Sequence, residues 1–176
     1  MTRLFIFLFT LMSSTMTTNT PTYIELSGEE TKISGNLAEG APMTDLSWAW
    51  SSSNACFPET QKEHFTGYHV LYYFDLPSYT EVEIELIPDD VDADFSLYAY
   101  EVGQVSKNNT VPNLSSCVRC EADHKQDRKI RGRTQDHRRI VKDILAIRNP
   151  YQVVIGVVGA QGRAGGKFKL KIKRVE

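Results

Sequence analysis

The sequence has only three cysteines, no apolar run long enough to cross a membrane and no strong excess of charge of either sign. The apolar run at the N-terminus, residues 4–12, is shorter than the roughly 20 residues that a spanning helix needs. With 20 basic and 22 acidic residues the net charge is −2, so overall charge gives no reason to expect nucleic acid as a partner. The patterns G-x-S-x-G and H-E-x-x-H and a glycine-rich phosphate loop before a helix are also missing. The sequence therefore predicts neither a membrane anchor nor an enzyme of these classes.

The first twenty residues are typical of a secretory signal. Arg3 precedes the apolar run 4–12, and a stretch rich in serine and threonine follows it at 13–20. We predict a signal peptide over residues 1–20 and a mature domain over 21–176. Loss of Arg3 leaves 19 basic against 22 acidic residues and a net charge of about −3. The mature protein is expected to be secreted or periplasmic, with no membrane association once the signal is removed.

Several segments show the period-two alternation of β-strands with one buried face. Glutamates alternate with apolar residues over 81–86, and lysines do so over 167–173. Apolar residues recur at every second position over 70–76 and 95–99, whereas 151–158 is almost continuously apolar and β-branched, as in a strand buried on both sides. At 176 residues with 41% hydrophobic composition, the chain is expected to form one domain.

Irregular segments separate these strands. Residues 38–67 lack periodicity and predict a long loop or insertion, and 103–132 is polar and rich in turn residues. Residues 140–147 fit either a strand or a helical face, and the pattern alone does not separate the two. The predicted fold class is all-β: an antiparallel, jelly-roll-like β-sandwich, a single domain with long loops.

An ordered set of short motifs resembles the bacterial pre-peptidase C-terminal domain. The motifs are Ile33-Ser34-Gly35-Asn36-Leu37, Tyr72-Tyr73-Phe74-Asp75-Leu76-Pro77, Asp92-Ala93-Asp94-Phe95-Ser96-Leu97-Tyr98 and Tyr151-Gln152-Val153-Val154-Ile155-Gly156-Val157. The resemblance covers most of 31–175 and implies a jelly-roll-like sandwich of the kind usually appended to secreted peptidases and generally not catalytic itself. This chain departs from the family in having no peptidase domain and in the length of its loops at 38–67 and 103–139.

Four aspartates, Asp89, Asp90, Asp92 and Asp94, form the densest carboxylate group and are the candidate calcium ligands, because Ca²⁺ prefers several hard oxygen ligands. The spacing of the last three is similar to the start of an EF-hand loop, but the glycine and distal glutamate of that loop are missing. The alternative is a solvated turn whose aspartates accept hydrogen bonds from nearby backbone N–H groups.

The three cysteines permit three interpretations: a disulfide, a zinc site or free thiols. In an exported protein Cys56 is expected to form a disulfide with Cys117 or Cys120, leaving one thiol. Alternatively Cys117, Cys120, His124 and His137 supply four ligand types suited to tetrahedral zinc, although their order and spacing do not match the usual finger.

Two sets of residues are candidates for ligand binding. A basic segment would pair with sulfate, phosphate or carboxylate groups through Arg128, Lys129, Arg131, Arg133, Arg138 and Arg139. The aromatic residues Trp48 and Trp50 would line a carbohydrate or peptide groove, or would instead anchor the long loop to the sandwich.

These observations predict a secreted, non-catalytic binding module for an extracellular polymer or protein, with no certain cofactor and calcium as the candidate. One alternative is a structural or chaperone-like accessory to a separately encoded secreted peptidase, and it depends on the family resemblance alone. A further alternative is a small zinc-dependent enzyme that uses the cysteine and histidine group. Nucleic acid is not an expected partner, since no aromatic residues interleave with the basic segment to stack bases.

Overall fold

The computed structural model describes residues 19–126 and 137–175, and in this part of the chain two β-sheets pack face to face. The first sheet has the order β1-β4-β9-β6-β7, with β3 paired to β4. Its strands are β1 (Thr22–Tyr23), β3 (Ala41–Pro42), β4 (Tyr68–Leu76), β6 (Phe95–Val102), β7 (Cys120–Asp123) and β9 (Tyr151–Gly159). The pairings are antiparallel except for the short parallel pairing of β1 with β4. The predicted all-β sandwich is confirmed.

The second sheet has the order β2-β10-β5-β8 and is antiparallel throughout. Its strands are β2 (Glu30–Asn36), β5 (Thr80–Pro88), β8 (Arg139–Ala146) and β10 (Lys167–Val175). The two sequences with alternating charge become neighbouring strands, since Lys171 on β10 lies opposite Glu85 on β5, and the Lys171 Nζ is 3.0 Å from the Glu85 Oε2. Their apolar residues Ile84, Leu86, Leu170 and Ile172 point into the space between the sheets. Cross-strand pairs of opposite charge on the wet face help to fix this register.

The space between the sheets holds the inner core. It combines the alternating residues of β4, β5, β6 and β10 with those of β9, as the sequence predicts. Val70, Phe74 and Leu76 of β4 belong to it, and so do Phe95 and Leu97 of β6. Full burial of side chains of this size contributes about 1.5–3 kcal/mol each. This core accounts for the alternation seen in the sequence.

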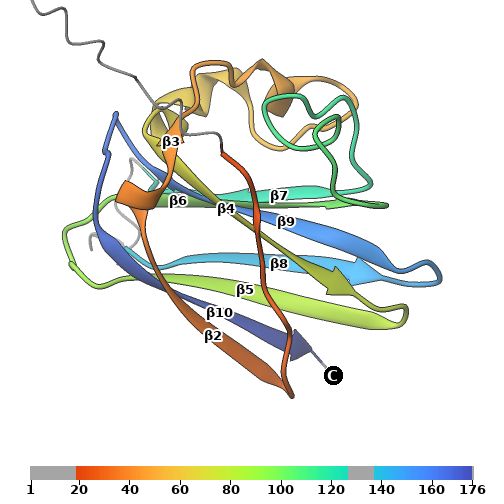
Figure 1. Ribbon diagram of the computed structural model, residues 1–176. Helices are drawn as coiled ribbons and strands as arrows, with labels where there is room; N and C mark the ends of the chain where they lie inside the picture. Colours follow the sequence, from red (N-terminus) through yellow and green to blue (C-terminus); the bar gives the residue numbers. More distant parts are fainter. Residues whose placement is uncertain (1–18, 127–136, 176) are drawn as a thin grey trace, which may run out of the picture.

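A second hydrophobic cluster, here called the outer core, lies on the other face of the first sheet. Loops and the short 3-10 helices η2 (Ser47–Trp50) and η3 (Glu59–Phe65) gather over this face (Figure 1). The 3-10 helix η1 (Leu37–Glu39) instead lies between β2 and β3 and contributes Leu37 to the inner core. The outer core consists of Met43, Leu46, Trp48, Ala49, Phe57, Phe65, Leu71, Tyr98, Tyr100, Val102, Val111, Leu114, Val154 and Val158. Because β6 is packed on both faces, all eight of its residues are buried.

The covering loops are fastened to each other and to the sheet. The side-chain amide of Asn54, which is buried, donates hydrogen bonds to the carbonyl oxygens of Trp48, at 2.8 Å, and Leu114, at 3.0 Å. A disulfide joins Cys56 of the first loop to Cys120 at the start of β7. The predicted disulfide is thus confirmed, and Cys117 is the cysteine that stays a thiol.

The two sides of the sandwich differ in how they are closed. On one side, β8 is hydrogen-bonded to the first sheet: the Ile140 N–H donates to the Asp123 carboxylate at 2.8 Å and the Leu145 N–H to the Glu101 carboxylate at 2.9 Å. On the other side, β2 faces β1 and β4, and no strand of the described residues bridges the two sheets there. The open side is where the candidate site lies.

Candidate functional site

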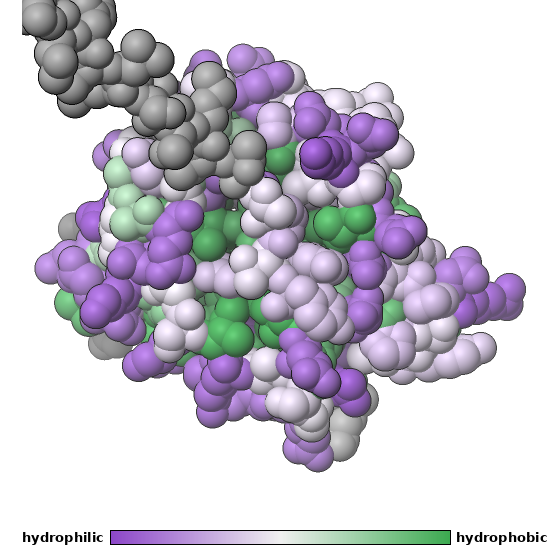
Figure 2. All heavy atoms as spheres, viewed as in Figure 1, coloured by the Kyte–Doolittle hydropathy of each residue, from purple (hydrophilic) through white to green (hydrophobic). Residues whose placement is uncertain are grey.

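A groove of about 280 Å³ opens at this side of the sandwich. Figure 2 shows, on the face viewed, apolar residues at the floor of hollows between ridges of hydrophilic side chains. The groove is lined by Asn19, Thr20, Thr22, Ser34, Glu39, Gly40, His69, Val70, Leu71 and Tyr72. Its volume is just below the range of about 300–1,000 Å³ typical of small-molecule pockets.

Asn19 holds one wall of the groove in place. Its side-chain Oδ1 accepts a hydrogen bond from the Ala41 N–H at 2.9 Å, and its Nδ2 donates to the Ala41 carbonyl at 3.3 Å. The Asn19 amide thus pairs with β3 as a neighbouring strand would. Next to it, β1 pairs in parallel with β4, with Thr22 opposite Tyr72. The N-terminal segment is therefore fixed at both ends of the groove.

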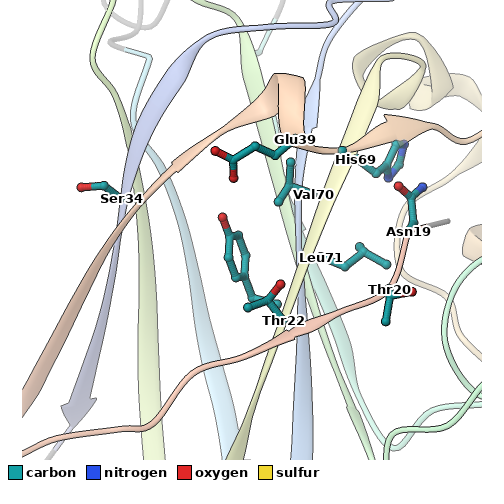
Figure 3. Close-up of a pocket in the computed structure, with 10 residues that line it drawn as sticks. Asn19, Thr20, Thr22, Ser34, Glu39, His69, Val70 and Leu71 are labelled. Carbon is teal, nitrogen blue, oxygen red and sulfur yellow. The ribbon is translucent and has the colours of Figure 1, made fainter. Parts of the chain in front are cut away.

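Polar residues from three parts of the fold line the groove. Figure 3 shows Thr20 and Thr22 on the N-terminal segment, Glu39 at the end of η1 and Ser34 on β2, with Val70 on the strand between them. The Ser34 side chain points away from the other residues, on the exposed face of β2. The Tyr72 hydroxyl lies over Gly35, where a Cβ atom would collide with it. Burial, reinforced by the negative charge of Glu39, raises the pKa of Tyr72 to about 12. Its hydroxyl is thus protonated and able to donate at neutral pH.

His69 lines the groove but is not a free base in it. Its Nε2 lies 2.9 Å from the Phe65 carbonyl oxygen and its Nδ1 lies 3.2 Å from the Tyr98 hydroxyl, so the ring belongs to the outer core. A neutral ring fits both contacts: Nε2–H donates to the carbonyl, and Nδ1 accepts from the hydroxyl. Desolvation by burial lowers the pKa of His69 to about 4.

This burial predicts a loss of stability in acid. The unfolded chain binds a proton at His69 below its ordinary pKa of 6.5, whereas the folded chain does so only near 4. The contribution of neutral His69 to the free energy of unfolding should therefore be fully present above pH 6.5. The free energy of unfolding should fall by about 3 kcal/mol as the pH drops to 4. Urea unfolding across this range measures the effect, and His69→Gln should flatten the slope. An unchanged slope in this variant would contradict the assignment.

The aspartates proposed as calcium ligands make contacts within the protein. The Asp90 carboxylate accepts a hydrogen bond from the Asp92 N–H at 3.0 Å, and the Asp89 Oδ1 lies 3.8 Å from the Lys169 Nζ. The Asp94 Oδ1 lies 3.7 Å from the guanidinium Nη2 of Arg139. Within 19–126 and 137–175, no group of three or more acidic, cysteine or histidine side chains is placed to hold a metal ion. Calcium binding by this turn stays a prediction.

The disulfide removes one of the four candidate zinc ligands. Cys120 is bonded to Cys56, so one of the four side chains is not a thiolate ligand. His124 instead stacks on His64, with ring centroids 4.5 Å apart. Burial raises the pKa of the Cys117 thiol to about 11.

The candidate ligand-binding residues of the sequence lie in different environments. Arg128, Lys129, Arg131 and Arg133 lie outside the described residues. Arg138 is exposed beside Glu85, at 3.3 Å, whereas Arg139 is buried and its Nε donates to the Phe95 carbonyl at 2.9 Å. Trp48 is buried against Tyr98, with ring centroids 5.2 Å apart, and Trp50 is half-buried. The two tryptophans therefore occupy the place of loop anchors.

The fold defines the chain as a β-sandwich domain. The solved structures that resemble it include the following three, each with low sequence identity. The pre-peptidase C-terminal domain of a collagenase from Bacillus anthracis is 12% identical, over 89% of this chain and 97% of that one, with a TM-score of 0.42. PliG of Aeromonas hydrophila, a periplasmic inhibitor of g-type lysozyme, is 9% identical over 89% and 96%, with a TM-score of 0.40. CorA of Methylomicrobium album BG8, a surface-associated copper-binding protein, is 9% identical over 88% and 97%, with a TM-score of 0.47.

No model of a known protein family matches the chain, and no curated protein matches its sequence. Kinship with the pre-peptidase C-terminal domains therefore stays a prediction from the motifs. Among the described residues no helix is long and apolar enough to cross a membrane.

Proposed function

We propose that this protein is an exported, non-catalytic binding module for an extracellular polymer, and that the groove between β1, β4 and β2 is its binding site. The observation that carries the proposal is the polar lining of that groove, on walls held by hydrogen bonds. Thr20, Thr22 and Tyr72 contribute hydroxyl-bearing side chains to its lining, and Glu39 adds a carboxylate. Both ring nitrogens of His69 are occupied elsewhere, so this histidine is not available as a general base in the groove.

Export is supported by two independent features. The Cys56–Cys120 disulfide is of a kind that persists in oxidising compartments such as the periplasm and the extracellular space. The charged and apolar start of the chain is typical of a secretory signal. A binding module in that setting meets cell-wall and matrix polymers.

Co-sedimentation with insoluble polymers tests the proposal. Peptidoglycan, chitin, cellulose and collagen are each mixed with the protein at low and at high salt. We expect retention on at least one polymer that persists at high salt, because the groove lining has a single charged residue. Retention that disappears at high salt would instead implicate the basic segment. No retention on any of the polymers would overturn the proposal.

A groove-blocking variant ties retention to the site. Thr22 is exposed on β1 and faces the groove, so Thr22→Tyr should fill the space while keeping a residue that favours strands. The matched control, Ser52→Tyr, adds the same ring at an exposed position in the covering loop. Retention should be lost in the first variant and kept in the second.

One surface favours a protein partner as a second candidate. At the tip between β4 and β5, Tyr79 is 84% exposed, and Ile147, at the neighbouring turn after β8, is 65% exposed. The Ser78 hydroxyl donates to the Arg148 carbonyl at 2.9 Å and holds the two turns together. Exposed aromatic and apolar residues on a fixed turn suit a protein interface. An accessory role beside a secreted peptidase would use this end, and copurification of a peptidase that depends on Tyr79 would favour it.

A further inference from the structure

The charges around the groove restrict what it can bind. Among the described residues that form the lining, Glu39 is the only charged one, and none is Lys or Arg. Phosphate and sulfate groups are recognised by Arg, Lys or clustered backbone N–H groups, and a carboxylate repels them. The groove is therefore unsuited to the polyanions that the basic segment would attract.

Glu39 is itself available to a ligand. Its side chain is exposed, and no cation of the described chain lies within ion-pair distance of its carboxylate. It lies close enough to Tyr72 for its charge to contribute to the raised pKa of that phenol. A carboxylate beside a protonated hydroxyl offers an acceptor with a negative charge next to a donor.

The remaining lining is suited to a ligand rich in hydroxyl groups. The hydroxyls of Thr22 and Tyr72 can each donate and accept a hydrogen bond. An apolar ligand would leave such groups without partners, which costs affinity. A volume of about 280 Å³ suits one small polar unit rather than a folded segment of protein.

We propose that the groove binds an amine-bearing sugar unit of a polysaccharide, with the ammonium group on Glu39 and the sugar hydroxyls on Thr22 and Tyr72. This inference depends on the proposed function, since it names the ligand class of the same site. The charge of Glu39 selects the amine, and the surrounding hydroxyls select the sugar over the side chain of a lysine.

A matched series of soluble ligands tests the assignment. Hexamers of β-1,4-linked glucosamine, N-acetylglucosamine and glucose share a backbone and differ at position 2 in an amine, an acetamide or a hydroxyl. Isothermal titration of the full secreted chain should show the glucosamine hexamer binding about two- to five-fold more tightly than the other two at low salt. Glu39→Gln should abolish this preference. Glu59→Gln, which removes an exposed carboxylate on η3, should leave it intact.

Each other outcome overturns the inference. Equal binding of the three hexamers, or a preference that survives Glu39→Gln, would show that Glu39 does not select an amine. Hexalysine that binds as tightly as the glucosamine hexamer would show that the hydroxyls do not select a sugar. If insoluble polymers retain the protein in a manner sensitive to Thr22→Tyr but no hexamer binds, the inference fails and the proposed function stands. Absence of retention would make the proposed function fail first.

Discussion

Replacing Cys56 and Cys120 together with serine is expected to lower the free energy of unfolding by about 4 kcal/mol. The disulfide spans 64 residues of sequence, so its removal frees a long loop in the unfolded chain. In the folded state it fastens the loop that carries Trp48 and Phe57 to the edge strand β7. Loss of the bond should therefore also loosen the cover of the outer core. Guanidinium unfolding followed by tryptophan fluorescence measures both effects, because Trp48 is buried in that cluster.

The third cysteine supplies the control for this prediction. Cys117→Ser removes a thiol that is not in the disulfide, and we expect a change below about 1 kcal/mol. Thiol titration of the denatured wild-type protein should find one reactive group. Reducing agent should reproduce the loss of stability in the wild type and leave the double variant unchanged. Three reactive thiols without reductant, or equal stability of the two variants, would contradict the assignment.

Gly156→Val is expected to cost more than about 4 kcal/mol and to prevent stable folding at 37 °C. Gly156 lies in the middle of β9, directly opposite Tyr98 on β6. A Cβ atom at this position would lie well inside van der Waals contact with the ring carbons of Tyr98. That ring is fully buried among aromatic neighbours, Trp48 and Tyr100 among them, and has no space into which to move.

The matched control for this change is Gly103→Val. Gly103 follows β6 in an exposed turn, and nothing lies within 4 Å of the place where its Cβ would be. We expect its effect to stay within about 0.5–1 kcal/mol. Expression level and thermal unfolding of the two variants compare them directly. Similar melting temperatures for both would show that the outer core is not packed as described.

The strands β5 and β10 were predictable because each has one wet face. The glutamates of β5 and the lysines of β10 mark that face, and the apolar residues between them follow. For β8 the pattern alone left strand and helix open. At Lys142 and Asp143 two consecutive residues are exposed, and Asp143 has φ of 60°. This bulge shifts the alternation by one residue, so that the buried Val141 and Ile144 are three residues apart, a spacing that also fits a helix. Ile140 and Ile147, which suggested a helical face, are exposed.

The outer core was not predictable in the same way. Tyr98 and Tyr100 lie between residues of the inner core on β6, and period two gives no reason to bury both faces of a strand. The partners that cover these tyrosines come from a loop more than forty residues earlier, where Trp48 and Phe57 follow no regular period. The sequence indicated that the loop is anchored by its aromatic residues but not what they pack against.

The groove left almost no trace in the sequence. Its polar residues, Thr22, Ser34 and Glu39 among them, are common surface types without a motif. They meet because β1 pairs in parallel with β4 while β2 lies in the other sheet. Such long-range pairing depends on packing rather than on local propensity.

Because Asn19 is hydrogen-bonded to Ala41, the position at which the signal peptide is cleaved decides whether the groove stays intact for binding. A signal peptidase that cut after residue 20, as the sequence first indicates, would remove Asn19 together with the wall that it holds. A mature chain that retains the groove must begin at or before Asn19. N-terminal sequencing of the exported protein would therefore also show whether the mature chain keeps the groove.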